Sequence, residues 1–435
     1  MLSGDEMRKR EIAGLGSFQF MAMTRRGLFY GFLTLYMLEV LKRSFTEAIL
    51  AMALPMLANS LTQTFIWGPL SDKLRVRRLL IVIGETIAGI AYIFLSPTVW
   101  SICTGLNPLQ AKTLYAITII VGLTLLESFW SMSNVGWSAL IADMTEPAER
   151  GTIMGQLNSI GAIGRIIGVF AGGLLYDFPS KAQGFPILFY ISSTIMFTSA
   201  ITLLITIEEP KKLISRREEP IIQIEEEFPL KHLFYWFLIS LFFISASSAS
   251  VMQLLSYYVR IALLATSFDI SLIRNAASIT NFIANPIIGI LSDKKGRKPV
   301  LLIGFATAIL VPILYTLPRS IFGMVLVSAV AGVIMAIRLT VSYTFVAELI
   351  PEEQRGKYFG QYNMISTLSF GVTPIIISGV FTDHLTKTFL EKGYVLEQAQ
   401  ILAITNTFYL AAFLAGIGFL IFCKMIFASR TTKIK

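Results

Sequence analysis

Four polar side chains recur at helical spacing inside an otherwise apolar stretch, LLESFWSMSNVGWSAL. Glu127, Ser131, Asn134 and Ser138 lie three or four residues apart, so a helix would present all four on one face. A carboxylate in this setting can bind a proton or pair with a cation. Because a charge that faces lipid near the bilayer centre is strongly destabilising, this face is predicted to line a polar interior.

Arginines occur in the same apolar setting. The charged residues inside the apolar stretches are the arginines Arg25, Arg26, Arg165, Arg274 and Arg338 and the glutamates Glu85 and Glu127. Each costs roughly 2.5 to 3.5 kcal/mol when it faces lipid, so all are predicted to face an interior. Two glutamates cannot neutralise so many arginines. The surplus of positive charge favours an anionic or carboxylate-bearing ligand.

The composition is that of a membrane protein. Hydrophobic residues make up 54% of the 435 residues and charged residues 14%, against roughly 25% charged in soluble domains. Apolar stretches of about 20 residues recur along the whole chain, which excludes a soluble domain behind a cleaved signal peptide. The first span is then an uncleaved anchor.

Apolar runs of helix length predict twelve membrane-spanning helices and an all-α polytopic fold. The predicted spans are 12–35, 46–69, 79–97, 113–140, 152–175, 187–207, 233–255, 268–291, 299–317, 322–346, 358–381 and 401–423. A charged segment with three prolines, 208–232, separates the sixth span from the seventh and is predicted to be a solvated cytoplasmic linker. The predicted domains are therefore 1–207 and 233–435.

The placement of Lys and Arg predicts the orientation. These residues are concentrated in alternate connections, including 71–78, the linker and 292–298, and in both chain ends. The positive-inside rule therefore places both termini in the cytoplasm of a multi-pass protein of the plasma membrane. The net charge of +9 follows from this topology and does not indicate binding to nucleic acid.

Two sequence motifs recur half a chain apart. GPLSDKLRVRRLL begins at Gly68 and GILSDKKGRKPVL at Gly289, while RGTIMGQLNSI begins at Arg150 and RGKYFGQYNMI at Arg355. Acidic residues precede the second motif in both copies, as Asp143 and Glu348. The whole six-helix unit is therefore predicted to be duplicated, with matched connections on the same face.

With these motifs in two six-helix halves, the sequence resembles the major facilitator superfamily. The family signature, Gly-x-Leu-Ser/Ala-Asp-Arg/Lys-x-Gly-Arg-Arg/Lys, is met at every specified position by residues 289–298. The first copy departs from it, because Arg75 replaces the glycine and Val76 replaces the following arginine. The resemblance covers the whole chain and is specific for the fold, but it does not identify a substrate.

The resemblance implies that these motifs latch one conformation of a transporter at the cytoplasmic face. Their carboxylates can accept hydrogen bonds at helix ends, and their cations can meet lipid headgroups or the acidic residues nearby. A simpler interpretation is a polar turn that anchors the chain by its positive charge. The candidate latch residues are Gly68, Asp72, Lys73, Arg77, Asp143, Arg150, Gly289, Asp293, Lys294, Gly296, Arg297, Lys298, Glu348 and Arg355.

The resemblance also implies that spans 1, 4, 7 and 10 line a central cavity. The candidate substrate-binding residues are Arg25, Arg26, Glu127, Asn134, Asn281 and Arg338, with Glu127 as the hypothetical proton-coupling residue. One alternative starts the first helix at Gly27 and leaves Arg25 and Arg26 in the cytoplasm. The internal repeat argues against it, because it pairs them with Ala246 and Ser247 inside the seventh span. A second alternative is a structural ion pair between Glu127 and Arg165.

These observations predict a monomeric secondary transporter for a small solute, anionic or carboxylate-bearing, that works by alternating access, with proton coupling as a hypothesis. A multidrug exporter is the alternative, although the Gly-Pro step and the Arg-x-x-Gln-Gly motif typical of drug–proton antiporters are missing. A non-transporting receptor is the alternative from another class. We expect neither an enzyme nor a cofactor or metal, because no nucleotide-binding loop or cluster of metal ligands occurs.

Overall fold

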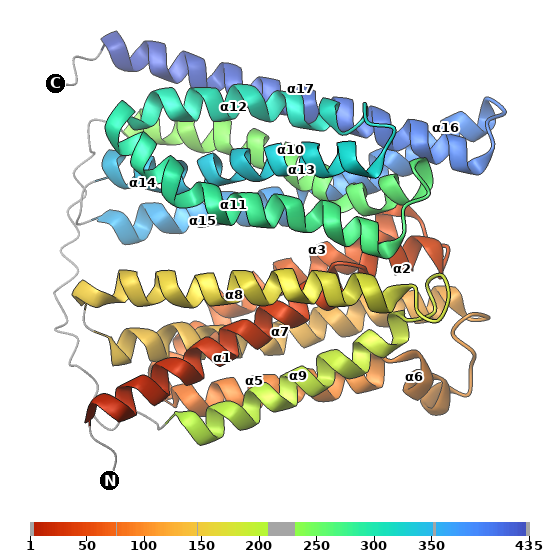
Figure 1. Ribbon diagram of the computed structural model, residues 1–435, viewed down its shortest axis with the longest axis horizontal. Coiled ribbons are helices and arrows are strands. Elements are labelled where there is room, and N and C mark those ends of the chain that lie inside the picture. Colours follow the sequence, from red (N-terminus) through yellow and green to blue (C-terminus); the bar gives the residue numbers. More distant parts are fainter. Residues whose placement is uncertain (1–3, 75, 146, 208–230, 351–353, 432–435) are drawn as a thin grey trace. The chain divides into compact units, whose positions relative to one another are not determined.

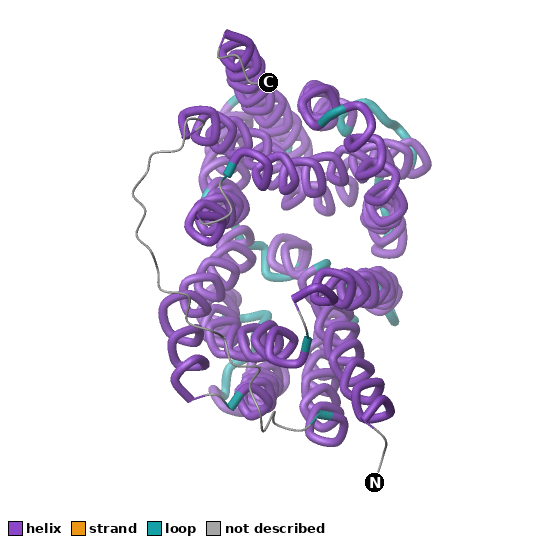
Figure 2. The backbone as a smooth tube through the Cα atoms, turned by 90° about the vertical axis from the view of Figure 1, so that its left-hand side faces the viewer, coloured by secondary structure: helices purple, strands orange, loops and turns teal. Residues whose placement is uncertain are grey.

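A computed structural model describes residues 4–74, 76–145, 147–207, 231–350 and 354–431. Every regular element in this part of the chain is a helix (Figure 1). The predicted linker, 208–232, lies outside the described residues except for Lys231 and His232, which begin a helix. The chain forms two compact units, and within each the long helices run alongside one another (Figure 2).

The first unit comprises the described residues of Met1–Arg43 and Leu50–Ile222. Its helices are α1 (Gly4–Tyr30), α2 (Leu33–Glu39), α3 (Phe45–Thr62), η1 (Gln63–Trp67), α4 (Gly68–Leu74), α5 (Arg77–Leu95), α6 (Pro97–Thr104), α7 (Lys112–Met144), α8 (Pro147–Tyr176) and α9 (Phe185–Thr206). The first residues of α3, within Ser44–Ile49, group with the second unit.

The second unit comprises Ser44–Ile49 and the described residues of Gln223–Lys435. Its helices are α10 (Lys231–Ala262), α11 (Ser267–Lys295), α12 (Arg297–Leu314), α13 (Ile321–Ala336), η2 (Ile337–Val341), α14 (Ser342–Leu349), α15 (Arg355–Gly371), η4 (Ile375–Phe381), α16 (Thr382–Glu391) and α17 (Leu396–Thr431). The elements η1, η2 and η4 are π-helical turns within longer helices, a rare geometry that is frequent at functional sites.

Ten helices of the described chain, counted across their π-helical turns, are long and apolar enough to cross a membrane. Two more, α1 and α11, span 27 and 29 residues and correspond to the first and eighth predicted spans. The predicted polytopic helical fold is therefore confirmed in this part of the chain. Two details differ from the prediction: α1 begins earlier and breaks at Gly31 and Phe32, and the connection between the third and fourth predicted spans contains α6.

Local sequence signals start several helices. Thr266 and Asp269 form a reciprocal capping box at α11, in which each side chain accepts a hydrogen bond from the backbone N–H of the other. The side chain of Ser96 accepts from the backbone N–H of Val99 at the start of α6, and Pro97 occupies the first helical position. These caps satisfy N–H groups that have no partner within the helix.

Glycines bring α1 and α8 into close contact in the first unit (Figure 1). A Cβ atom at Gly164 would lie 2.4 Å from the carbonyl oxygen of Phe20, and one at Gly168 would lie 2.1 Å from that of Thr24. Small residues on one helix allow two backbones to approach in a membrane, where apolar burial gives little driving force. The glycines of α8 therefore allow it to pack closely against α1.

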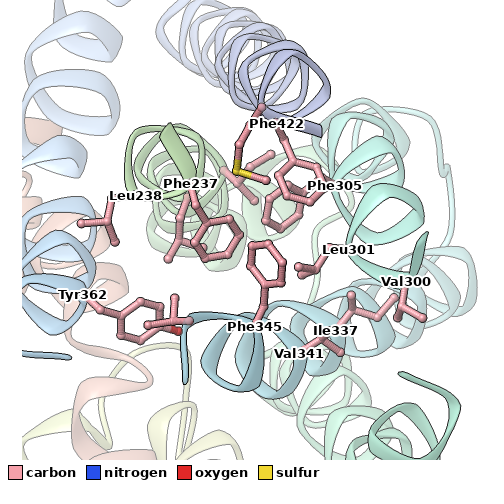
Figure 3. Close-up of a cluster of buried hydrophobic side chains, with 14 of the residues drawn as sticks. Phe237, Leu238, Val300, Leu301, Phe305, Ile337, Val341, Phe345, Tyr362 and Phe422 are labelled. Carbon is pink, nitrogen blue, oxygen red and sulfur yellow. The ribbon is translucent and has the colours of Figure 1, made fainter. Parts of the chain in front are cut away.

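A cluster of buried aliphatic and aromatic side chains lies in the interior of the second unit (Figure 3). The ring of Phe237 on α10 lies 5.0 Å from that of Phe345 on α14 and 6.0 Å from that of Phe422 on α17. Phe305 on α12 completes the group, 4.9 Å from Phe422. These edge-on and tilted contacts are the arrangements that aromatic pairs prefer, and they join four helices in one core.

We predict that Gly168→Ala lowers the free energy of unfolding of the purified protein by about 1 to 3 kcal/mol, and with it the melting temperature, because the added methyl group collides with the backbone of α1. Gly155→Ala on the same helix is the control. A Cβ atom there meets nothing within 4 Å, so this change should be neutral or slightly stabilising. Equal melting temperatures for the two variants would contradict the close contact of α1 and α8.

Candidate functional site

The carboxylate of Glu127 is the centre of a buried polar cluster in the first unit. Its Oε1 atom accepts a hydrogen bond from the hydroxyl of Tyr30 at 2.9 Å and lies 3.3 Å from Nη1 of Arg25. Its Oε2 atom accepts from Nδ2 of Asn59 at 2.9 Å and lies 3.7 Å from Nη2 of Arg26. Helices α1, α3 and α7 thus meet at one carboxylate that has cations on both oxygens.

The side chain of Arg25 is fully buried, and within the described part of the chain only one of its three nitrogens has hydrogen-bond partners. Its Nη1 donates to the hydroxyl of Tyr92 at 2.7 Å, and its Cζ atom lies 4.7 Å from the ring centre of Trp130. The Nε and Nη2 atoms have no hydrogen-bond partner among the described residues. Trp130 also donates its Nε1–H to Oε1 of Glu85 at 2.6 Å. A second buried carboxylate therefore lies at the N–H edge of the same indole.

Two further arginines of this unit are accessible. The side chain of Arg26 is 37% exposed, and its Cζ atom lies 4.6 Å from the ring centre of Trp130. Arg165 on α8 is exposed and lies within electrostatic range of Arg26. Among the described residues, it has no carboxylate partner. The alternative ion pair between Arg165 and Glu127 is therefore not formed.

Arg25 and Arg26 lie in the last two turns of α1. The alternative first helix that begins at Gly27 is wrong, because α1 begins at Gly4. The position of the two arginines relative to the membrane stays a prediction. Two residues of the predicted polar face of α7 form hydrogen bonds to neighbouring helices instead of lining an open interior. Ser131 shares a hydrogen bond of 2.8 Å with the hydroxyl of Thr62, and Asn134 donates to Oε1 of Gln63 at 3.2 Å. Ser131 and Asn134 therefore join α7 to α3 and η1.

In the second unit, Arg338 lies on the π-helical turn η2 and is 7% exposed. Its Nη1 donates to the hydroxyl of Ser245 at 3.1 Å, and its Cζ atom lies 5.3 Å from the ring centre of Phe370. It has no carboxylate partner in the part of the chain that the structure describes. Asn281 donates to the backbone carbonyl of Gly332 at 3.4 Å and so joins α11 to α13.

The repeated motif is built around an arginine in each unit. Arg77 lies 3.1 Å from Asp143 and 3.2 Å from Asp72 through different nitrogens, and its Nη1 donates to the hydroxyl of Ser71 at 2.5 Å. Lys73 beside them is exposed. This is the first of two equivalent arrangements.

The second arrangement uses Arg297, which lies 3.0 Å from Glu348, pairs with Asp293 and donates to Ser292. Gly296, with a φ of +85°, makes the preceding turn. This backbone region favours glycine, which accounts for the glycine of the signature. Lys294 and Lys298 flank the arginine, and Gly289 lies opposite Thr340.

The sequence alignment of the two motifs does not reveal that Arg77 and Arg297 are equivalent. The alignment pairs Arg297 with Val76, but the side chain that makes the same contacts as Arg297 is that of Arg77, one residue further along. Val76 caps α5 in a non-helical conformation, with φ of −106° and ψ of 65°. Without glycine the connection takes one more residue before the arginine, so the apparently degenerate copy makes the same contacts. Gly68 is the first residue of α4 and directly follows η1.

Two candidate latch residues cannot be assigned contacts. Arg150 lies in the first turn of α8 and Arg355 is the first residue of α15, but their side chains lie outside the described part of the structure. The candidate residues missed from the sequence are Tyr30, Asn59, Ser71, Tyr92, Trp130 and Ser292. A polar residue such as Asn59 in an apolar span was the available signal, since it needs a partner in lipid.

Comparison with known proteins gives the family. The model described as Major Facilitator Superfamily matches residues 15–264 and again 237–435. The chain belongs to the major facilitator superfamily. It is accordingly a multi-pass membrane protein and a secondary transporter of a small molecule, in a family of transporters and not of enzymes. The fold class predicted from the sequence is thereby confirmed.

Relatives of this superfamily member are distant. It is 23% identical over 338 residues to the multi-drug resistance efflux pump PmrA homolog of Lactococcus lactis subsp. lactis (strain IL1403), covering 76% of this chain and 77% of that one. It is 25% identical over 264 residues to the multidrug resistance protein MdtG of Escherichia coli (strain SMS-3-5 / SECEC), covering 58% of this chain and 57% of MdtG.

Solved structures agree on the fold. A bacterial homolog of the human lysosomal transporter Spinster, in an inward-facing and unoccupied conformation, matches with a TM-score of 0.76 and 14% identity over 98% of both chains. The nucleoside transporter NupG matches with a TM-score of 0.69 and 16% identity, over 98% of this chain and 99% of its own. At these identities the likeness concerns the fold and not the substrate.

We predict that Arg77→Gln slows transport at least as much as Arg297→Gln, although the sequence of its motif is less regular. Arg77 is 9% exposed and its partner Asp143 20%, whereas Arg297 and Glu348 are 17% and 57% exposed. Hydrogen bonds to buried charges contribute about 1.5 to 3 kcal/mol and exposed pairs less than about 1 kcal/mol.

The measurement is flux per inserted molecule in vesicles, with Arg319→Gln, an exposed loop arginine, as the control. A wild-type rate for Arg77→Gln together with a slow Arg297→Gln would show that the first copy is degenerate after all.

Proposed function

We propose that this transporter moves a small anionic or carboxylate-bearing solute by alternating access, coupled to protons through Glu127. The observation that carries the proposal is the surplus of positive charge. Glu127 is shared by Arg25 and Arg26, while Arg165 and Arg338 have no carboxylate partner among the described residues. A buried or membrane-facing arginine without a counter-ion is costly, and a bound anion would remove that cost.

The available donors suit a carboxylate or phosphate. Arg26 and Arg165 belong to adjacent helices of the first unit and are both accessible. Arg338 in the second unit uses one nitrogen on the hydroxyl of Ser245. The planar guanidinium can offer two parallel N–H donors to two oxygens of one anion, which a point charge cannot do.

Glu127 supports a link between substrate and proton. An anion that binds Arg26 would withdraw one positive charge from the carboxylate, and a proton could then replace it. In this scheme the substrate and the proton act on the same carboxylate, so one affects the binding of the other. The hydroxyl of Tyr30 and the amide of Asn59 would hold the side chain in place throughout.

We also propose that the protein acts as a monomer in the plasma membrane with both termini in the cytoplasm, and that residues 1–207 and 233–435 form the halves that move. The arginine-centred motifs at Arg77 and Arg297 latch the cytoplasmic ends of the helices in one conformation. Asp72, Asp143, Asp293 and Glu348 are the acidic partners that would be exchanged when the conformation changes.

A second candidate function is the export of amphipathic drugs. The observation in its favour is that distant relatives are multidrug efflux pumps. A matched series of organic anions, neutral analogues and cations in vesicles with an imposed pH gradient separates the candidates. Saturable transport confined to the anions supports the first, and transport of lipophilic cations supports the second.

We predict that Arg26→Gln and Arg338→Gln each weaken the binding of transported anions by about tenfold or more, which corresponds to about 1.4 kcal/mol, and change the binding of neutral analogues far less. The loss of a charge-assisted hydrogen bond is the physical reason. The measurement is substrate affinity in purified protein, with Arg319→Gln as the control. Equal losses for anions and neutral analogues would contradict an electrostatic role.

We predict that Glu127→Gln inserts normally and exchanges substrate across the membrane, but no longer accumulates it against a gradient. The amide keeps the shape of the side chain and cannot carry a proton. Counterflow and pH-driven uptake in the same vesicles measure the two activities. Retained pH-driven accumulation would remove Glu127 as the proton site and leave a uniporter or another coupling ion.

A further inference from the structure

Glu85 is a buried carboxylate that the proposed scheme does not use. It lies on α5 and is 0% exposed, and together with Glu127 it is one of two carboxylates that are more than nine-tenths buried in the described chain. Glu127 has a cation at each oxygen, whereas Glu85 has none within ion-pair distance. A carboxylate anion this deep in the protein would be uncompensated, so this environment favours the protonated acid.

The unsatisfied atoms around Glu85 belong to two residues that share a neighbour. Oε1 of Glu85 accepts from Trp130, and Oε2 has no hydrogen-bond partner. Nε and Nη2 of Arg25, whose guanidinium lies over the same indole, have none either. Tyr92, two helical turns from Glu85 on α5, accepts from Arg25. The face of α5 that carries Glu85 is therefore the face that Arg25 contacts.

Among the charged groups of this cluster, Arg25 is the cation that is available as a counter-ion for Glu85. From α1 the charged and titratable groups of this cluster are Arg25, Arg26 and Tyr30, and from α7 the group is Glu127. The hydroxyls of Ser133 and Ser199 are neighbours of the carboxylate, but neither completes a hydrogen bond to Oε2. Helices α6 and α9, which also pack on α5, contain no charged residue.

We propose that Glu85 and Glu127 compete for Arg25, so that the two carboxylates share one proton. In the conformation described, Arg25 pairs with Glu127 and Glu85 holds the proton. When Glu127 takes up a proton, Arg25 turns its unpaired nitrogens to Glu85, which releases its own proton. The number of protons and charges in the cluster is unchanged by the exchange. The proposal rests on the proposed proton role of Glu127, and it adds a second proton-binding residue behind it.

Infrared spectroscopy of the purified protein in lipid nanodiscs tests this sharing without transport. The C=O stretch of a protonated carboxyl is separate from the carboxylate bands. At neutral pH, we expect one buried protonated carboxyl in the wild type and none in Glu85→Gln. We expect none in Glu127→Gln either, because Arg25 is then free to ionise Glu85. Removing Arg25 as well, in Glu127→Gln with Arg25→Gln, should restore the signal.

Glu391→Gln, which removes an exposed carboxylate at the end of α16, should leave the signal unchanged. Thermal unfolding checks that each variant is folded, and Glu127→Asn repeats the test with a smaller side chain. A signal that persists in Glu127→Gln would overturn the proposal, because Glu85 would then be a permanently protonated structural acid. Its absence from the wild type would also overturn it. Transport assays test the proposed function separately. Proton-coupled accumulation by Glu127→Gln would refute the role of Glu127 in transport, whereas the infrared signals decide whether Glu85 and Glu127 share a proton.

Discussion

The ion pair between Arg25 and Glu127 is the constraint on which the first unit depends. A buried ion pair is a poor source of stability compared with apolar side chains of the same size, but breaking one by removal of a partner costs about 3 to 5 kcal/mol. The chain surrounds this pair with Tyr30, Asn59 and Tyr92. Helices α1, α3, α5 and α7 each contribute to it. Because apolar side chains would hold these helices together at least as well, the retained charges agree with the proposed role of Glu127 in transport.

The two units share a fold but not this chemistry. The repeat places Ala246 and Ser247 where the first unit has its two arginines, and a cluster of aliphatic and aromatic side chains lies in the interior of the second unit. One of its buried cations, Arg338, contacts a hydroxyl and a ring. A duplicated scaffold can diverge in this way because packing needs only apolar residues of suitable size, whereas a charge needs specific partners. The proposed proton chemistry therefore belongs to the first unit, and the proposed anion recognition involves arginines of both.

Much of the fold could be predicted from the sequence because lipid leaves few alternatives. An apolar run of about 20 residues must satisfy its own backbone groups and does so as a helix. The repeated motifs likewise indicated matched connections. The partners of individual charges could not be predicted, because they depend on which faces of distant helices meet. Glu127 pairs with Arg25 and not with Arg165, and Arg77 replaces the aligned Val76 through a local change at a helix start.

The interior cluster and the two motifs share one arrangement, an arginine that has two acidic residues near it. Arg77 lies between Asp72 and Asp143, and Arg297 lies between Asp293 and Glu348. In the interior, the guanidinium of Arg25 lies beside one carboxylate, that of Glu127, and over the indole whose N–H group binds a second, that of Glu85. A cation with two acidic partners can leave one while it is held by the other, so it avoids the full penalty of an unpaired charge. Exchange of partners is therefore a low-energy route by which a conformational change and a change of protonation state can be linked in a membrane protein.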